Sequence, residues 1–183
     1  ELTNACNLDC VMCGRDESEF AVKFIDIEYL RKLEPILKYV EEVTLFGWGE
    51  PTIHPKFRDI LEFLDRYPVR KYFVTNGTTL HRIREYLFDC KVDIMAVSLD
   101  GATAKTNNAI RRKSNFDQIV SELRSVVQQK RNGNTGYPYI NFVFTLMRSN
   151  LDELPEMVDL AYSIGIEEVK AVYMTSFSKD LED

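Results

Sequence analysis

Three cysteines lie close together near the start of the chain, at Cys6, Cys10 and Cys13. Thiolates are the ligands that zinc and iron–sulfur clusters prefer in proteins. Structural zinc and iron–sulfur cubes normally close with four protein ligands, and one short loop here offers three. A centre with three protein ligands keeps a coordination position for a reactant. The spacing therefore indicates a metal centre that takes part in chemistry rather than one that only supports the fold.

The alternative for this triplet is a structural zinc site completed by Cys90 or His54. Zinc-binding modules ordinarily supply a second close pair of ligands, which this sequence lacks. Cys90 ends a segment with helical apolar spacing, which favours a buried thiol. His54 precedes Pro55 at the start of another helical pattern, so we expect it to cap that helix. The sequence thus favours an open cluster over closed zinc.

Composition and charge set the broad class of the protein. The 183 residues are 45% hydrophobic and 28% charged, as expected of one globular domain spanning 1–183. A net charge of −6 argues against nucleic acid or an anionic membrane as partner. Clustered thiols without disulfide spacing indicate a reducing compartment, so we expect a cytoplasmic protein. The chain starts without methionine, and we expect it to be a piece of a longer protein, lacking a final helix and C-terminal extension.

Apolar periodicity alternates between strand-like and helix-like segments from end to end. Pro35 is expected to kink or split the first helix, Ser114 to cap a later one, and Gly165 to end the last. The pattern predicts an α/β fold, a partial (β/α)6 TIM-like barrel of parallel strands. The expected strands are 1–5, 43–46, 71–75, 92–99, 139–147 and 168–174, and the expected helices are 26–41, two that begin near 54 and 80, 115–131 and 152–164.

Polar and glycine-containing motifs follow the predicted strands one after another. In a parallel barrel the carboxyl ends of the strands meet at one rim, where the chemistry of such folds gathers. Residues distant in the sequence are therefore expected to be neighbours in space. The motifs are the cysteine loop, Gly47-Trp48-Gly49-Glu50-Pro51, Thr75-Asn76-Gly77 and Ser98-Leu99-Asp100-Gly101 after the first four strands, with polar segments after the fifth and sixth.

The order of these motifs resembles that of the radical S-adenosylmethionine (radical SAM) enzymes, over the chain from Glu1 to about Met174. The resemblance implies a 4Fe–4S cluster held by Cys6, Cys10 and Cys13. Its fourth iron would chelate the amino and carboxylate groups of S-adenosylmethionine. One electron then yields a 5′-deoxyadenosyl radical that abstracts hydrogen from a substrate. A reductant such as flavodoxin or ferredoxin is the implied partner.

The same resemblance assigns residues to the cofactor, and their chemistry suits the task. Gly49 has no side chain, so backbone can approach the methionine moiety closely. Glu50 can accept a charge-assisted hydrogen bond from the ligand ammonium group. Asn76 and Ser98 offer neutral donors and acceptors for ribose hydroxyls and the carboxylate. Asp100 is expected to give structural support rather than a ligand contact.

Two further contacts are implied by the resemblance, and two positions depart from its pattern. The backbone of Met12 meets the adenine, and Arg111 faces the ligand carboxylate, a bidentate task suited to arginine. Trp48 stands where many members have a glycine, and Arg112 likewise follows Arg111 in place of glycine. The Gly-Trp-Gly-Glu-Pro form resembles the branch that modifies peptides or matures cofactors, including SPASM or twitch proteins and the molybdenum-cofactor enzymes.

Four aromatic residues near the strand ends could be mistaken for a stacking set, but aromatic residues in buried strands usually belong to the core. We expect this of Phe46, Trp48, Phe73 and Tyr173.

The sequence therefore predicts a radical SAM enzyme whose substrate, a peptide or a small molecule, is not identified by any side chain. The alternative is an iron–sulfur electron-transfer module without substrate turnover of its own. The motifs after the second, third and fourth strands discriminate between the two, because an electron carrier needs no pocket for a sulfonium compound.

Overall fold

A parallel β-sheet of five strands forms the centre of the computed structural model, which describes residues 1–17 and 21–175. The strands lie in the order β2-β3-β4-β6-β7, and every neighbouring pair is parallel. Spatial order follows chain order, as in the barrel half that the sequence predicts. The bounds are β2 (Glu42–Leu45), β3 (Arg70–Thr75), β4 (Ile94–Ser98), β6 (Tyr139–Leu146) and β7 (Glu168–Tyr173).

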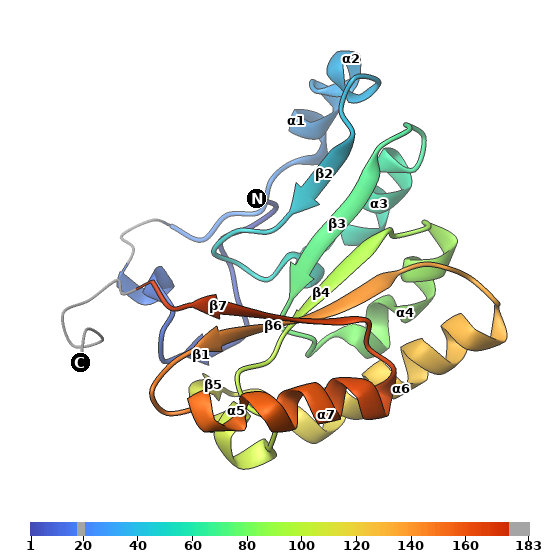
Figure 1. Cartoon of the computed structure of the whole chain (residues 1–183). Coiled ribbons are helices and arrows are strands. Elements are labelled where there is room, and N and C mark those ends of the chain that lie inside the picture. The colour runs from blue at the N-terminus through green and yellow to red at the C-terminus, as the bar shows by residue number, and fades with distance from the viewer. Residues whose placement is uncertain (18–20, 176–183) are drawn as a thin grey trace.

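Helices connect the strands and cover one face of the sheet (Figure 1). Alternate strand residues such as Phe73, Phe142 and Phe144 are fully buried in the hydrophobic core beneath these helices. The covering helices are α3 (Phe57–Leu64), α4 (Leu80–Asp89), α6 (Phe116–Asn132) and α7 (Leu154–Ile164). None of the helices in 1–17 and 21–175 combines the length and apolar character needed to cross a bilayer.

Several predicted helix boundaries are confirmed. The first helical segment is split into α1 (Ile27–Arg31) and α2 (Glu34–Leu37), with Pro35 in the first turn of α2. Gly165 ends α7 with a left-handed φ of 94°, which glycine adopts without strain. The predicted cap of α6 is wrong by one residue, because the side chain of Asn115 accepts from the Gln118 amide.

The predicted first strand, 1–5, is not a strand of the sheet. Thr3 makes one isolated antiparallel bridge with Phe24, and the Ala5 carbonyl accepts a 2.7 Å hydrogen bond from the Glu50 amide. The segment therefore crosses the turn that follows β2 instead of running along that strand. Alternating apolar residues fit both paths, which is why periodicity could not separate them.

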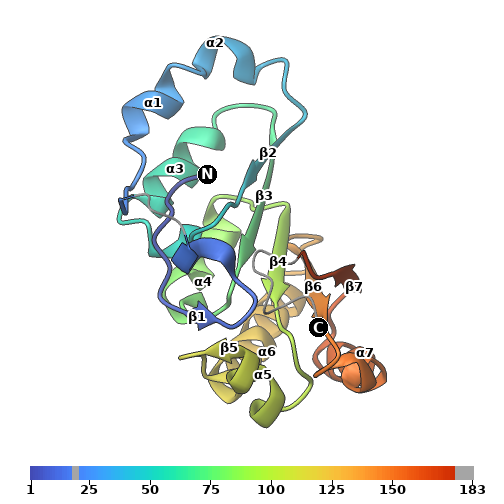
Figure 2. The same ribbon diagram turned by 90° about the vertical axis from the view of Figure 1, so that its left-hand side faces the viewer.

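Three short elements escaped sequence prediction. Helix α5 (Ala104–Ile110) leads into the two-residue strand β5 (Arg111–Arg112), which pairs antiparallel with β1 (Asp9–Cys10) inside the cysteine loop. Figure 2 shows the blue N-terminal segment, with β1, lying next to β5. The cysteine loop is thereby brought to the rim where the other motifs lie.

Candidate functional site

A pocket of about 230 Å³ opens at the carboxyl ends of β2, β3 and β4. It lies between the cysteine loop, the turn after β2 and the ends of β3 and β4. Every residue that the sequence assigned to the cluster or to the cofactor lines it. These nine residues are Cys6, Cys10, Met12, Cys13, Gly49, Glu50, Asn76, Ser98 and Arg111.

The cysteine loop is held in place by the β1–β5 ladder. Cys10 pairs with Arg111 in the register of the two strands, and the Val11 amide donates to the Ile110 carbonyl at 2.9 Å. The Asp9 carboxylate adds an ion pair with Lys113, Nζ to Oδ2 at 2.5 Å. The ladder and the ion pair explain how Arg111, 101 residues downstream of Cys10, helps to position it.

Asn76 fixes the other end of the loop. Its Nδ2 donates to Asn7 Oδ1 at 2.9 Å and lies 3.8 Å from Cys6 Sγ, while its Oδ1 accepts from the Thr78 amide at 3.0 Å. The Leu8 amide is a second donor to Cys6 Sγ, at 3.5 Å. Hydrogen bonds to ligating sulfurs tune the potential of iron–sulfur clusters. Asn76 is thus bonded to the cysteine loop itself as well as lining the pocket.

Glu50 joins the turn after β2 to the end of β3. It is 3% exposed, and its carboxylate accepts hydrogen bonds from Thr75 Oγ1 at 2.7 Å and from the Asn76 amide at 2.6 Å. The Thr52 amide and hydroxyl donate to it at 3.1 and 2.5 Å. Three of these four bonds go to Oε1, which leaves Oε2 with one donor. A further donor from a ligand can therefore be accepted only at Oε2.

Glu50→Gln tests this arrangement through the pH dependence of folding. Burial raises the pKa of the Glu50 carboxyl, against four hydrogen bonds that lower it. A carboxyl with a raised folded-state pKa favours folding most below its unfolded pKa of about 4.3, and that contribution is lost as the pH rises through the folded pKa. The unfolding free energy of the wild type minus that of Glu50→Gln should therefore fall from about pH 4 to neutral. Urea titrations of both apoproteins across this range measure it, and a rising difference contradicts the account.

Burial also changes the chemistry of two of the thiols. It raises the pKa of Cys10 to about 11, although the nearby Arg111 guanidinium lowers it. It raises the pKa of Cys6 as well, against the hydrogen bond from Leu8. Both thiols therefore keep their protons at neutral pH until a metal displaces them.

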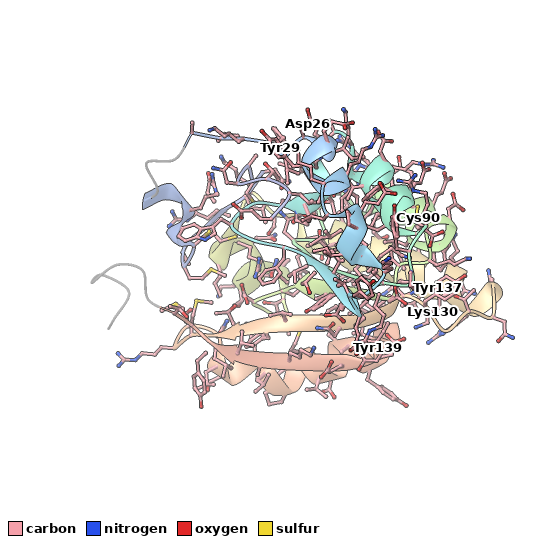
Figure 3. The ribbon with its side chains drawn as sticks, turned by 90° about the horizontal axis from the view of Figure 1, so that it is seen from above. Asp26, Tyr29, Cys90, Lys130, Tyr137 and Tyr139 are labelled. Carbon is pink, nitrogen blue, oxygen red and sulfur yellow. The ribbon has the colours of Figure 1, made fainter. Side chains whose placement is uncertain are left out.

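The structure disfavours the zinc alternative. His54 is 4% exposed, and both ring nitrogens are used, Nε2 by the Ile25 carbonyl at 3.0 Å and Nδ1 by the Lys56 amide at 3.1 Å. Cys90 is buried at the end of α4, and Figure 3 shows it on the other side of the molecule from η1 (Gly14–Glu17), the turn that follows Cys13. Neither can complete a site with the triplet.

Within 1–17 and 21–175, no three side chains of His, Cys, Asp or Glu converge as ligands of one metal ion. Three thiolates that bind three different irons of a cluster lie further apart than three ligands of a single ion. The donor set, three free thiols on one loop beside a pocket, fits a cluster.

Sequence reasoning missed the aromatic side of the pocket. Phe46 and Trp48 line it and are 54% and 46% exposed, so their assignment to the core is wrong, as is that of Tyr173 at 90%. Phe73 is buried as expected. The signal was available in the alternation of β2, because Leu45 points into the core and its neighbour Phe46 must point the other way.

A comparison with protein-family models identifies the family of this chain. The family model described as the Radical SAM superfamily matches residues 1–161. The mycofactocin maturase MftC of Mycobacterium tuberculosis is 30% identical over 175 residues, which cover 90% of this chain and 41% of that protein. A probable GTP 3′,8-cyclase of Methanocella arvoryzae is 32% identical over 161 residues, covering 86% of this chain and 50% of that protein.

Among solved structures, Streptococcus suis SuiB bound to S-adenosylmethionine superposes with a TM-score of 0.78. The match has 13% sequence identity and covers 98% of this chain and 41% of that one, so it shows the fold alone. The α/β partial-barrel prediction is thereby confirmed. The chain spans half or less of the length of these relatives.

Proposed function

Because this chain belongs to the radical SAM superfamily, we propose that it is the part of an enzyme that binds a 4Fe–4S cluster and S-adenosylmethionine in the pocket at the strand ends. The observation that carries this proposal is the meeting of nine residues, chosen for these roles from the sequence, around one pocket. When bound, the cluster supplies one electron that cleaves the sulfonium compound and releases a 5′-deoxyadenosyl radical for hydrogen abstraction.

Cys6, Cys10 and Cys13 would hold the cluster. The chain prepares two of them: Asn76 and the Leu8 amide approach the Cys6 sulfur, and Arg111 Nη1 lies 4.0 Å from the Cys10 sulfur. These donors and this positive charge oppose the effect of burial and favour the thiolate form that binds a cluster iron.

The cofactor would lie among the other six residues. Glu50 Oε2 can accept from its ammonium group, and Arg111 can pair with its carboxylate. Ser98 and Asn76 suit the ribose hydroxyls and the carboxylate, and the Met12 backbone suits the adenine. Phe46 and Trp48 add apolar surface that excludes water from the place where the radical forms.

An electron carrier without its own substrate is the weaker reading. Such a protein gains nothing from a pocket that combines a buried carboxylate, a guanidinium and two exposed aromatic rings beside the thiols. For the proposed enzyme, the electron that reduces the cluster would come from a flavodoxin or ferredoxin in the cytoplasm.

Anaerobic reconstitution tests the function directly. The protein, with iron, sulfide and dithionite, should bind about four irons per chain and convert S-adenosylmethionine to methionine and 5′-deoxyadenosine. Iron analysis and chromatography of the products measure both. Stoichiometric zinc with no adenosine product would refute the proposal, and cluster loading without cleavage would favour the electron carrier.

We further propose that the enzyme acts in the maturation of a peptide or a cofactor precursor. The maturase relative favours this, and the probable GTP cyclase relative makes a nucleotide the competing substrate. Deuterium transfer from a candidate substrate into 5′-deoxyadenosine distinguishes the two.

A further inference from the structure

Asp100 follows β4, two residues after Ser98. It is 0% exposed. Its Oδ1 accepts from the Thr145 amide at 2.7 Å, its amide donates to Asn107 Oδ1 at 3.0 Å, and its carbonyl accepts from Asn150 Nδ2 at 3.0 Å. Asp100 therefore ties the end of β4 to α5 and to the end of β6.

The remaining oxygen, Oδ2, lies 2.7 Å from Arg111 Nε. Both atoms are buried, and neither has a hydrogen-bond partner among the described residues, so the contact is an ion pair and not a linear hydrogen bond. The Arg111 side chain is 10% exposed. A buried guanidinium without a counter-charge is strongly unfavourable, so the pair fixes where this side chain lies.

The Arg111 side chain lies next to three parts of the site. Nε meets Asp100, Nη1 lies 4.0 Å from Cys10 Sγ, and the side chain lines the pocket. The β1–β5 ladder fixes only its backbone beside Cys10. The ion pair with Asp100 therefore sets the direction of the guanidinium group.

We propose that Asp100 is a positioning residue that holds the Arg111 guanidinium between the Cys10 sulfur and the pocket, so that one cation serves both the cluster and the cofactor carboxylate. This inference rests on the proposed function. Asp100 touches neither group and acts through Arg111. It also balances the positive charge of Arg111 beside the cluster.

Asp100→Asn isolates the ion pair. The asparagine Oδ1 can still accept from the Thr145 amide, whereas its NH2 group places a donor against the Arg111 donor. In reconstituted protein with unchanged iron content, the Kd for S-adenosylmethionine should rise at least tenfold by calorimetry. Arg111→Ala should weaken binding similarly, and the double variant should be no weaker than Arg111→Ala alone. Additive losses, or unchanged binding by Asp100→Asn, overturn the inference.

The reduction potential supplies a readout that a merely structural role would not move. Loss of a negative charge near the cluster favours its reduction, and loss of a positive charge opposes it. Redox titration should shift the potential upward in Asp100→Asn and downward in Arg111→Ala. Shifts of the same sign, or none, contradict the charge balance.

A matched control and a second variant keep the test decisive. Asp93 Oδ2 accepts from the Lys71 amide at 2.7 Å at the opposite end of the sheet, so Asp93→Asn should change neither Kd nor potential.

If Asp100→Asn does not fold, Arg111→Lys keeps the charge without the guanidinium fork and should still raise the Kd at least tenfold. Wild-type affinity in Arg111→Lys refutes the inference. Wild-type protein that loads iron but binds no S-adenosylmethionine refutes the proposed function instead.

Discussion

Cys10→Ala is expected to abolish cluster assembly, because it leaves two of the three thiolates that the loop offers. The iron content after anaerobic reconstitution should fall from about four per chain to near zero, with loss of visible absorption. S-adenosylmethionine cleavage should be lost with it. The side chain itself is small, and the β1–β5 ladder that holds position 10 is made of backbone groups, so the apoprotein should remain folded. Iron analysis and circular dichroism on the same sample separate cluster loss from unfolding.

Cys90→Ala is the matched control, since it removes the remaining thiol of the chain from a site away from the pocket. Its iron content should equal that of the wild type. A modest loss of stability is expected, because Cys90 is 2% exposed and packs in the hydrophobic core. If Cys90→Ala lost the cluster while Cys10→Ala kept it, the assignment of the cluster to the first loop would be wrong.

The parts of the site that could be predicted from the sequence are those set by strand ends. Ser98 ends β4, Asn76 directly follows β3, and Glu50 lies in the turn after β2, so their meeting follows from the fold class. The cysteine triplet was predictable from spacing, because three thiols within eight residues of one another must also lie close together in space.

The parts that could not be predicted depend on contacts without a local signature. Two-residue strands carry no alternation, so nothing in the sequence around Arg111 indicates its ladder with Cys10. The role of Asn76 toward Cys6 and Asn7 is likewise a contact between two loops about 70 residues apart. Such contacts form only when distant segments meet in the folded chain, so local propensity does not indicate them.

Gly49→Ala is the second change expected to have a large effect. The motif suggests that this glycine serves the approach of the cofactor, whereas the structure indicates a clash with neighbouring backbone. A Cβ at Gly49 would lie 2.1 Å from the Thr3 carbonyl oxygen and 2.5 Å from that of Ala5. Both neighbours are backbone, so neither can rotate away as a flexible side chain could. The segment that leads into Cys6 would have to move, and overpacking of this kind costs about 1–3 kcal/mol of folding free energy. Urea unfolding of the apoprotein measures this loss.

Gly136→Ala is the matched control for this change, because no heavy atom lies within 4 Å of a Cβ placed there. It should leave both stability and iron content near wild-type values. Gly49→Ala should also impair cluster loading, since the displaced segment carries the hydrogen bond from the Glu50 amide to the Ala5 carbonyl, one residue before Cys6. If Gly49→Ala were as stable as Gly136→Ala and loaded iron fully but bound S-adenosylmethionine poorly, the glycine would serve the cofactor alone. A loss of both stability and iron places it instead as the point where the turn after β2 and the cysteine loop pack backbone against backbone.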